Sequence, residues 1–567
     1  MKHWLLILIA IVPAWAIDLP TGGKALELQK ISAHVFPDNG RAQSTGEGKL
    51  QLQITRADPS RPFVAQCSAT AIDPHKIPKN SPILAIIRCR ALGPKRTAFL
   101  AKWQLGAAPY TAYTGMMEVP VTSEWQDCPV LLITQQDIDT TRLQLTLLCG
   151  QQAQEWEVAK IEAWLYPAGT DVTHFPRIRR SYEGRDAKAP WRAEAMARIE
   201  QQRKRDLSLI LRDEQGKVLP DRSVTLTLRR HAFGFGSAIP VSRLLDPSPD
   251  GDAFRRIVDN HFSMVVFEND LKDYGWNPDA SDAQKQKRNQ QLDRALAWLA
   301  ERKIAVRGHY LMQTARPHNL AGKSADQVRR HFLESTRERL AFVGNRVCEW
   351  DVINHPVAWA GADLLTKHQG LERIDREVFD LARQLTTLPC FVNEDQIFRP
   401  GAQSDGTFLY LQSLKSEGYP VAGLGNQAHF DESYLPSPTE MLATTDRFAA
   451  IVPRQIITEF DVVTTADEEL AADFTRDAMI ATFSHQAYHG FMLWGFWEGS
   501  HWKPQAASWN RDWTIRPRGQ AFVDLLTKQW HTEVTLRSDQ NGKVTWRGFP
   551  GWYEAQGESI PKWQEVQ

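Results

Sequence analysis

The chain has no excess of either charge, because its 567 residues include 67 acidic and 67 basic side chains. A basic surplus, the main electrostatic signature of a nucleic-acid-binding protein, is therefore missing. Beyond the N-terminus no run reaches the roughly 18 apolar residues that a membrane-spanning helix needs. Cysteine is scarce too, and none of the six has the C-x-x-C spacing of a zinc site. The sequence thus argues against nucleic-acid-binding, membrane-spanning and zinc-binding classes, and it indicates no metal and no cofactor.

Residues 1–16 have the pattern of an export signal. A positive start at Lys2 and His3 precedes the apolar run 4–12, and residues 14–16 fit a small-residue cleavage site. We therefore expect export, ending in the periplasm, on the cell surface or outside the cell. Such compartments are oxidising, so disulfides can form there.

The cysteines fall into two groups. Four of them lie in the first 150 residues and allow two disulfides, in any of three connectivities: Cys67, Cys89, Cys128 and Cys149. Cys348 and Cys390 lie far downstream in apolar, strand-like runs. We expect buried thiols at these two positions, with a late disulfide as the alternative.

Residues 17–175 predict an all-β sandwich. Alternating or β-branched runs are separated by turn residues at 51–56, 82–89, 130–134, 142–149 and 157–166. The chain has 20 tryptophans, whose rings either fill a core or offer faces on which sugars pack. Both interpretations stay open for the four in this region, Trp103, Trp125, Trp156 and Trp164.

Two shorter segments flank the largest domain. Residues 176–230 predict a connector with a charged helix, opened by Pro190 in the first-turn position where proline is tolerated, followed by two strands. Residues 531–567 predict a C-terminal β-hairpin extension around an Asn541-Gly542 turn.

Residues 231–530 predict a (β/α)8 barrel. Apolar strands alternate with amphipathic helices, and the strands are expected at 233–240, 263–269, 304–312, 347–354, 390–395, 422–430, 456–462 and 490–496. Eight strands that alternate with helices over about 300 residues are typical of that barrel. A doubly wound open sheet is disfavoured, because no strand is followed by a G-x-G-x-x-G turn.

Polar side chains gather where these strands end. In a barrel of this class the chemistry lies at the carboxyl ends of the strands. A buried carboxylate or histidine is costly unless paired, so a convergent cluster indicates a site. Glu459 is the clearest case, because a carboxylate in the otherwise apolar run IITEFDV must be paired or act as a nucleophile or base. We expect His429 to orient it.

Seven motifs in this region occur in the order found in glycoside hydrolase family 10, the β-1,4-xylanase family. They are FENDLKDYGW (267–276), RGHYLM (307–312), WDVINHPV (350–357), FVNEDQ (391–396), GLGNQAHF (423–430), ITEFDV (457–462) and LWGFWEGSHW (493–502). Residues 192–530 therefore resemble that family of retaining barrel enzymes, and the first domain has the position of a carbohydrate-binding module.

The resemblance implies a site and a substrate class. Glu459 would be the nucleophile, and the cleaved sugar would be held by Glu268, Asn269, Lys272, His309, Asn354, Gln427, His429, Trp494 and Trp502. The partner would be a β-1,4-linked plant polysaccharide of the xylan type, bound by a monomer. Retaining hydrolysis needs one group to attack the anomeric carbon and another to protonate the leaving oxygen.

The chain departs from the family at the second of those groups. His355 stands where the family has its acid/base glutamate, Gln313 where it has a tryptophan, and Asp270 where it often has glutamate. An ionised Glu459 would raise the histidine pKa and favour an acid; esterification of Glu459 would lower it again, as a base requires. Glu394 or Asp395, at the next strand end, are alternative acids.

Three interpretations follow. The first is an exported retaining glycosidase with Glu459 as nucleophile and His355 as the altered acid/base. The second is a carbohydrate-binding protein that keeps the site and has lost turnover. The third, more remote, is a metal-dependent enzyme with His355, His429 and a carboxylate as ligands, although no tight ligand spacing supports it.

Overall fold

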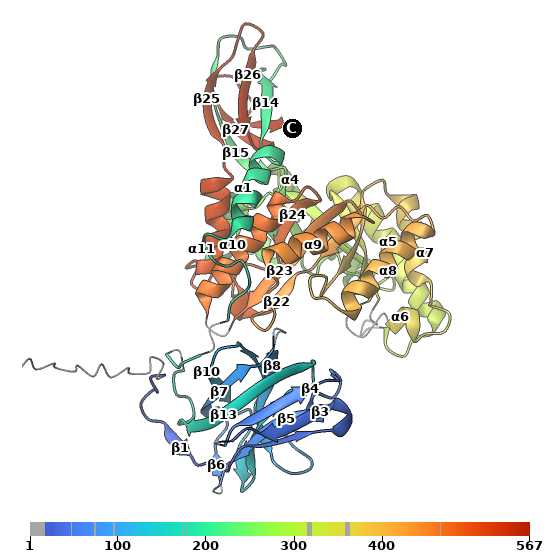
Figure 1. The fold of residues 1–567 in the computed structure, drawn as a ribbon. Helices are drawn as coiled ribbons and strands as arrows, with labels where there is room; N and C mark the ends of the chain where they lie inside the picture. The colour runs from blue at the N-terminus through green and yellow to red at the C-terminus, as the bar shows by residue number, and fades with distance from the viewer. Residues whose placement is uncertain are drawn as a thin grey trace, which may run out of the picture. The chain divides into compact units, whose positions relative to one another are not determined.

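The structure is a computed structural model that describes residues 17–46, 48–72, 75–93, 97–172, 174–177, 180–314, 320–357, 363–464 and 467–567. The chain divides into two compact units, Met1–Arg180 and Ser181–Gln567 (Figure 1). The expected export signal, residues 1–16, lies outside the described residues. Among the described residues no helix has the length and apolarity that crossing a membrane would require.

The first unit is a β-sandwich, as predicted. One sheet has the order β10-β7-β13-β4-β3, with β1 on β13, and the other has the order β2-β5-β12-β8-β9; β6 pairs with β11. The strands are β1 (Lys24–Leu26), β2 (Ser32–Val35), β3 (Gly40–Ser44), β4 (Leu50–Ile54), β5 (Ala65–Thr70), β6 (His75–Ile77), β7 (Pro82–Ala91), β8 (Thr97–Leu105), β9 (Met117–Val121), β10 (Gln126–Ile133), β11 (Ile138–Thr140), β12 (Leu143–Leu148) and β13 (Gln154–Leu165).

The tryptophans of the sandwich divide between core and surface. Trp103 and Trp156 are fully buried and belong to the core between the sheets. Trp125 and Trp164 are half-buried. The Arg90 guanidinium lies 4.8 Å from the centre of the Trp125 ring. Of these four tryptophans, Trp125 and Trp164 therefore keep part of their surface exposed.

All six cysteines are free thiols, so neither of the two disulfides that the sequence allows is present in this structure. The fold nevertheless brings two of them together, with the Cys89 and Cys128 sulfurs 3.6 Å apart. Their strands are antiparallel, but Cys89 lies directly opposite Gln126, so the two cysteines are diagonal neighbours.

The second unit contains the predicted (β/α)8 barrel. Eight parallel strands form it: β16 (Gly234–Ile239), β17 (Met264–Phe267), β18 (Ala305–Gln313), β19 (Glu349–Asn354), β20 (Cys390–Glu394), β21 (Gly423–Asn426), β23 (Arg454–Val463) and β24 (Tyr488–Leu493). The barrel closes because β16 pairs with β24 and β21 pairs with β23. The short strand β22 (His429–Asp431) adds to β23. The predicted fold class is confirmed.

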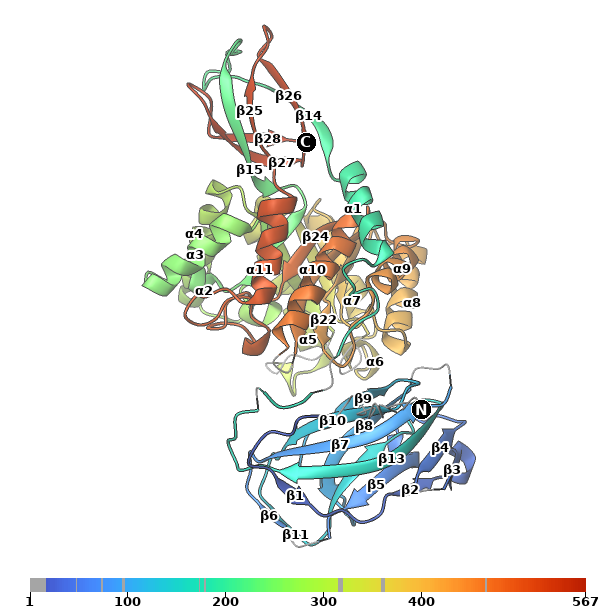
Figure 2. The same cartoon turned by 60° about the vertical axis from the view of Figure 1, so that its left-hand side comes forward.

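Helices surround these strands (Figure 2). They are α2 (Val241–Leu244), α3 (Pro249–His261), α4 (Asp282–Glu301), α5 (Ala325–Val343), α6 (Asp363–Thr366), α7 (Ile374–Leu385), α8 (Ala402–Ser416), α9 (Pro438–Ala449), α10 (Glu468–Ser484) and α11 (Pro517–Asp524). Serines 281, 324 and 437 begin α4, α5 and α9 with capping boxes, in which the serine and a Gln or Glu three residues later satisfy each other's backbone N–H groups.

The connector and the C-terminal extension pair with each other. After α1 (Pro190–Gln202), β14 (Arg205–Ile210) pairs with β26 (Lys543–Gly548). The connector strand β15 (Ser223–His231) lies between β25 (Glu533–Arg537) and β27 (Gly551–Gln556), and β28 (Trp563–Val566) completes that sheet. The expected turn at Asn541-Gly542 is present, with the Asp539 N–H donating to the Lys543 carbonyl over 3.0 Å, but the strands on either side of it, β25 and β26, each form their ladder with a connector strand.

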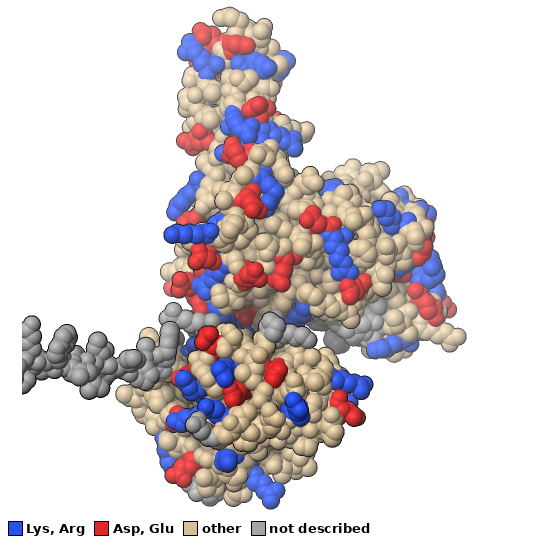
Figure 3. All heavy atoms as spheres, viewed as in Figure 1, with Lys and Arg blue, Asp and Glu red and all other residues tan. Residues whose placement is uncertain are grey.

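The two signs of charge are mixed over the surface. On the face shown in Figure 3, the blue Lys and Arg side chains lie interspersed with the red Asp and Glu side chains on both units. This distribution accompanies the zero net charge of the sequence.

Candidate active site

Glu459 lies on β23 and is 4% exposed. Its Oε1 accepts a hydrogen bond of 2.7 Å from the Asn393 amide, and its Oε2 is 3.3 Å from His429 Nε2. His309 Nε2 is 3.9 Å from Oε1. The predicted orienting contact between His429 and Glu459 is thus present, and an amide that the prediction did not include adds a second contact.

His429 is enclosed by two carboxylates. Its Nδ1 is 2.9 Å from Asp461 Oδ2, and its Nε2 faces Glu459, so both ring nitrogens donate. Burial would lower the pKa of His429, but Asp461 and Glu459 outweigh burial and raise that pKa to about 10. Glu459 and Asp461 share one face of β23 because side chains two apart on a strand point the same way.

Glu459 is an anion at neutral pH. Burial would raise its pKa, but the hydrogen bond and the positive charge of His429, together with the Lys272 ammonium, outweigh burial and lower the pKa to about 2. A carboxylate that is buried yet ionised has lost most of its water shell, and this leaves it available to attack an electrophilic carbon.

His309 presents an acceptor to the same space. Its Nδ1 lies 2.9 Å from Asp351 Oδ2, so this nitrogen donates to the carboxylate. Burial lowers the pKa of His309, so the ring is neutral and Nε2 carries a lone pair toward Glu459. That nitrogen can accept a hydrogen bond from a sugar hydroxyl.

Asn354 and Gln427 connect Glu459 to His355. Asn393 donates to Asn354 Oδ1 over 2.9 Å, and Gln427 Nε2 donates to the same oxygen over 3.1 Å. Gln427 Nε2 also lies 3.1 Å from His355 Nε2. The parallel register that pairs Asn354 with Asn393 brings these amides together.

A glycine makes room for this network. A Cβ at Gly425, the neighbour of Asn393 on β21, would lie 2.3 Å from Asn393 Oδ1. Any other residue would displace the amide that holds Glu459. Gly425 therefore contributes to the site by its lack of a side chain.

His355 follows β19 in a left-handed backbone conformation, with φ of 53°. Its N–H donates to the Asn393 carbonyl over 3.0 Å, and the Thr314 hydroxyl donates to its carbonyl. A non-glycine residue adopts this conformation at a cost that the surrounding structure must offset. Hydrogen bonds at its N–H and at its carbonyl therefore hold the backbone of His355 in place. The residue is 6% exposed.

Three further predicted residues, Glu268, Asn269 and Lys272, follow the end of β17. The Lys272 ammonium is 5.3 Å from the centre of the Trp494 ring, and burial lowers its pKa. Burial raises the pKa of Glu268, although the nearby Lys272 ammonium acts in the opposite direction. Asn269 is exposed and accepts a bond of 2.6 Å from the Tyr274 hydroxyl.

Trp502 forms a platform at the surface. Its ring is 43% exposed, and its indole N–H donates to Asp461 Oδ2 over 2.8 Å. The ring centre is 4.9 Å from that of His429. Asp461 therefore holds both the imidazolium and the platform.

The alternative acids, Glu394 and Asp395, differ in their surroundings. Glu394 is fully buried and accepts backbone N–H bonds of 2.8 Å from both Val357 and Asp395. Asp395 is 5% exposed and accepts from the Gln396 backbone. Both carboxylates are thus engaged by backbone N–H groups that follow the strand ends.

The prediction missed three contributing residues. Asn393, Asp461 and Asp351 hold Glu459, His429 and His309 respectively. Each is a polar residue in an apolar strand, the same signal that singled out Glu459. Asp351 also forms an ion pair with Arg307 on the neighbouring strand. This pair cannot be predicted without knowing the register of the two strands.

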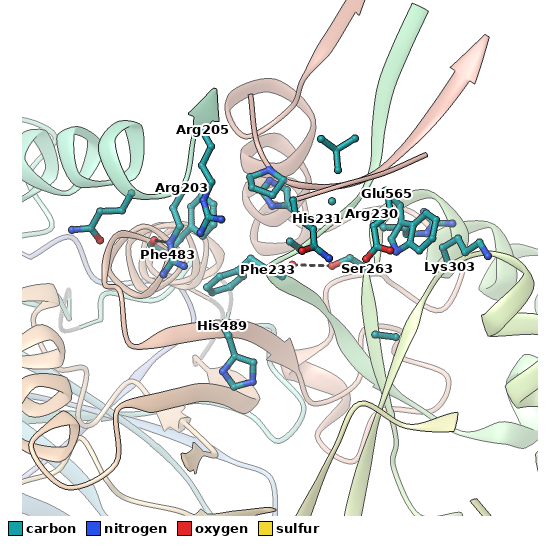
Figure 4. Close-up of a pocket in the computed structure, with 18 residues that line it drawn as sticks. Arg203, Arg205, Arg230, His231, Phe233, Ser263, Lys303, Phe483, His489 and Glu565 are labelled. Carbon is teal, nitrogen blue, oxygen red and sulfur yellow. Dashed lines mark hydrogen bonds between the residues drawn. The ribbon is translucent and has the colours of Figure 1, made fainter. Parts of the chain in front are cut away.

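A cavity of about 480 Å³ lies at the amino ends of the strands (Figure 4). Arg203 and Arg230 line it, but backbone carbonyls already engage Arg203 and Asp259 engages Arg230. The described residues that line it include none of the predicted site residues. For the metal-dependent interpretation, no group of three or more His, Cys, Asp or Glu side chains within the described ranges is arranged to hold an ion.

The model of glycosyl hydrolase family 10 matches residues 225–524, which is 300 of the 567 residues. The chain belongs to this family. Its barrel is thus a glycoside hydrolase domain, and the matched span contains every residue described above around Glu459.

Curated relatives of this family 10 chain include an anti-sigma-I factor and endo-1,4-beta-xylanases. The anti-sigma-I factor RsgI6 of Acetivibrio thermocellus is 29% identical over 369 residues, covering 64% of this chain and 46% of the relative. Endo-1,4-beta-xylanase 1 of Arabidopsis thaliana is 26% identical over 359 residues, covering 62% of this chain and 36% of the relative. The chain spans less than half the length of either.

Among solved structures, xylanase 10B from Thermotoga petrophila in complex with xylobiose is 20% identical. It covers 53% of this chain and 95% of its own, with a TM-score of 0.47.

Proposed function

We propose that the family 10 domain is a retaining glycosidase that acts on β-1,4-linked polysaccharide of the xylan type. Glu459 is the nucleophile, and His355 stands in place of the acid/base. The observation that carries the proposal is the state of Glu459: a buried anion with a pKa lowered to about 2, held by Asn393 and His429. The names of the plant relatives support the substrate class.

The chemistry has two steps. Glu459 attacks the anomeric carbon, the bond to the leaving oxygen breaks, and that oxygen takes its electron pair and acquires a proton. Water then attacks the same carbon and the ester bond to Glu459 breaks, which returns the carboxylate. Positive charge develops on the sugar in both steps, and the anionic site stabilises it.

The neighbours of Glu459 fit this role. His309 Nε2, Asn354 and Lys272 offer one acceptor and several donors for sugar hydroxyls. Trp494 and Trp502 offer ring faces on which sugar C–H groups pack. The proposal includes export, which the pattern of residues 1–16 supports.

The test compares the rates at which the full chain cleaves two substrates. Xylohexaose has a leaving group that needs a proton, whereas 4-nitrophenyl xylobioside has one that leaves without help. Products are identified by mass spectrometry, with and without EDTA. We expect cleavage of the aryl substrate at least, unaffected by EDTA, and Glu459→Gln should lower that rate on the order of 10⁴-fold or more.

The matched control is Glu417→Gln, a surface glutamate paired with Arg373 and Arg376, which should leave both rates unchanged. Binding of xylohexaose without cleavage of either substrate would overturn the proposal in favour of a non-hydrolytic carbohydrate-binding protein. Inhibition by EDTA would favour the metal-dependent interpretation.

A further inference from the structure

The residue behind His355 is a carboxylate. Glu394 ends β20 and is fully buried. Its Oε2 accepts from the Val357 N–H, and its Oε1 accepts from the Asp395 N–H, each over 2.8 Å. Oε1 is also 3.3 Å from His355 Nδ1. Because a carboxylate in such a setting is an acceptor, the hydrogen of His355 lies on Nδ1 and points at Glu394.

The other ring nitrogen of His355 faces an amide whose orientation the network determines. Glu459 requires a donor from Asn393, and the Thr458 hydroxyl donates to Asn393 Oδ1 over 2.7 Å. The amide nitrogen of Asn393 is thereby assigned. It donates to Asn354, so the atom of Asn354 at this contact is the oxygen.

The orientation of the Gln427 amide, assigned in the same way, determines which nitrogen of the His355 ring carries the hydrogen. Gln427 meets that Asn354 oxygen at 3.1 Å, so the Gln427 atom there is the nitrogen, and this nitrogen also lies 3.1 Å from His355 Nε2. An amide N–H2 only donates. His355 Nε2 therefore accepts, and it carries a lone pair rather than a proton.

We propose that Glu394 is a positioning residue that holds His355 in the Nδ1–H tautomer, so that in the resting enzyme His355 is a general base and not a general acid. This inference rests on the proposed function for its catalytic meaning. In the second step, Nε2 takes a proton from the attacking water while the water oxygen bonds to the anomeric carbon. The bond to Glu459 breaks with its electron pair, and the imidazolium, paired with Glu394, later returns the proton to solvent.

The substrate preference follows from the tautomer. With Nε2 unprotonated, the first step lacks a proton donor at this position, whereas the second step has its base. Glycosides whose leaving group departs as a stable anion should therefore react much faster than unactivated oligosaccharides. Loss of a general acid costs about 10²–10⁴-fold, which sets the expected gap between the two substrates.

A spectroscopic experiment tests the tautomer directly. The full chain is labelled with ¹⁵N-histidine, and the ring signals of His355 are assigned by their loss in His355→Ala. We expect one protonated and one unprotonated nitrogen, with the proton on Nδ1. In Glu394→Gln the two tautomers should mix, whereas Asp395→Asn, which alters the neighbouring carboxylate, should leave the signals unchanged.

A kinetic experiment measures turnover with and without azide, because this anion attacks the glycosyl-enzyme without needing a base. With the aryl substrate, Glu394→Gln should lower kcat about tenfold or more, as part of the 10²–10⁴-fold that a general base contributes, and should lower KM in parallel, because only the second step is slowed and the glycosyl-enzyme accumulates. Azide should restore the rate and yield a glycosyl azide, but should not accelerate the parent.

Two outcomes would overturn the inference: a proton on Nε2 in the parent protein, or a slow Glu394→Gln variant that azide does not rescue. If the parent turns over no substrate, the proposed function fails. The NMR result then still decides the tautomer, so the two failures are distinguishable.

Discussion

The barrel holds a buried cluster of charges at each end, and the two clusters differ in how the charges are satisfied. At the amino end, Arg307 contacts both Glu349 and Asp351, and His489 Nε2 lies 2.9 Å from Glu349. Asp351 joins this cluster to the site, because its other contact is His309 Nδ1. At the carboxyl end, Glu459 is held by a neutral amide and by His429.

The openness of the two ends differs as well. Arg307, Glu349 and Asp351 are at most 2% exposed, and each charge meets an opposite charge. Around Glu459 the Trp502 ring is 43% exposed. Burial and charge alone therefore do not identify a site. The distinguishing feature is a buried anion close to one solvent-exposed ring, Trp502, and to a group with a spare acceptor, His309 Nε2.

The comparison predicts that the amino-end cluster is structural. Arg307→Met leaves two carboxylates buried without their cation, which should lower the free energy of unfolding by about 3–5 kcal/mol. Hydrogen–deuterium exchange of peptides from β18 and β19 in urea would measure the loss locally.

Arg454→Met is the matched control, because Arg454 also approaches Glu349, at 3.6 Å, but its side chain is 45% exposed. Its effect should stay within about 1 kcal/mol. Equal losses in the two variants would contradict the structural role assigned to Arg307.

The carboxyl-end cluster should make the free energy of unfolding depend on pH. The pKa of His429 is raised to about 10, so its contribution to stability is complete below the unfolded value of about 6.5 and is lost as pH rises toward 10. Glu459 has a lowered pKa, so its contribution is complete above about 4.5 and is lost as pH falls toward 2.

Asp461→Asn separates the two contributions, because it removes the carboxylate that most raises the His429 pKa. The decline in unfolding free energy between pH 6.5 and 10, at most about 1.4 kcal/mol per pH unit for one proton, should shrink in this variant. An unchanged decline, measured by denaturant unfolding across that range, would mean that His429 is not the group responsible.

The smallest expected effect concerns the platform. Trp502→Phe keeps a ring face but removes the N–H bond to Asp461. A bond of this kind contributes about 1 kcal/mol, so KM for the aryl substrate should rise about fivefold at constant kcat.

Trp513→Phe is the control for this variant. Its N–H makes a similar bond of 2.8 Å to Asp250, away from Glu459 and its neighbours. A fall in kcat for Trp502→Phe, or the same KM change in both variants, would count against a binding role for Trp502.

Sequence patterns predicted the barrel because each strand and helix has a local signal. Glu459, His429 and His309 were recognisable as polar residues in apolar strands. The pairing of β14 and β15 with strands more than 300 residues later was not predictable, since antiparallel pairing over that distance leaves no local pattern. The sequence therefore suggested a closed hairpin where the structure has two separate pairings.

The hydrogen-bond roles were also beyond the sequence. Asn393 assigns the orientation of Asn354, and Asn354 assigns that of Gln427. These assignments depend on which side chains adjacent strands bring to contact distance. The sequence places a histidine directly after Asn354, but only the geometry shows which nitrogen of His355 faces Glu394.

Trapping of the glycosyl-enzyme tests the central claim most directly. A 2-fluoro xylobioside with a dinitrophenolate leaving group slows the second step more than the first, so an ester on the nucleophile accumulates. The account predicts that intact-mass measurement shows one added fluorosugar, that peptide mapping places it on Glu459, and that Glu459→Gln stays unmodified. An absent adduct, or an adduct on another residue, would contradict the account.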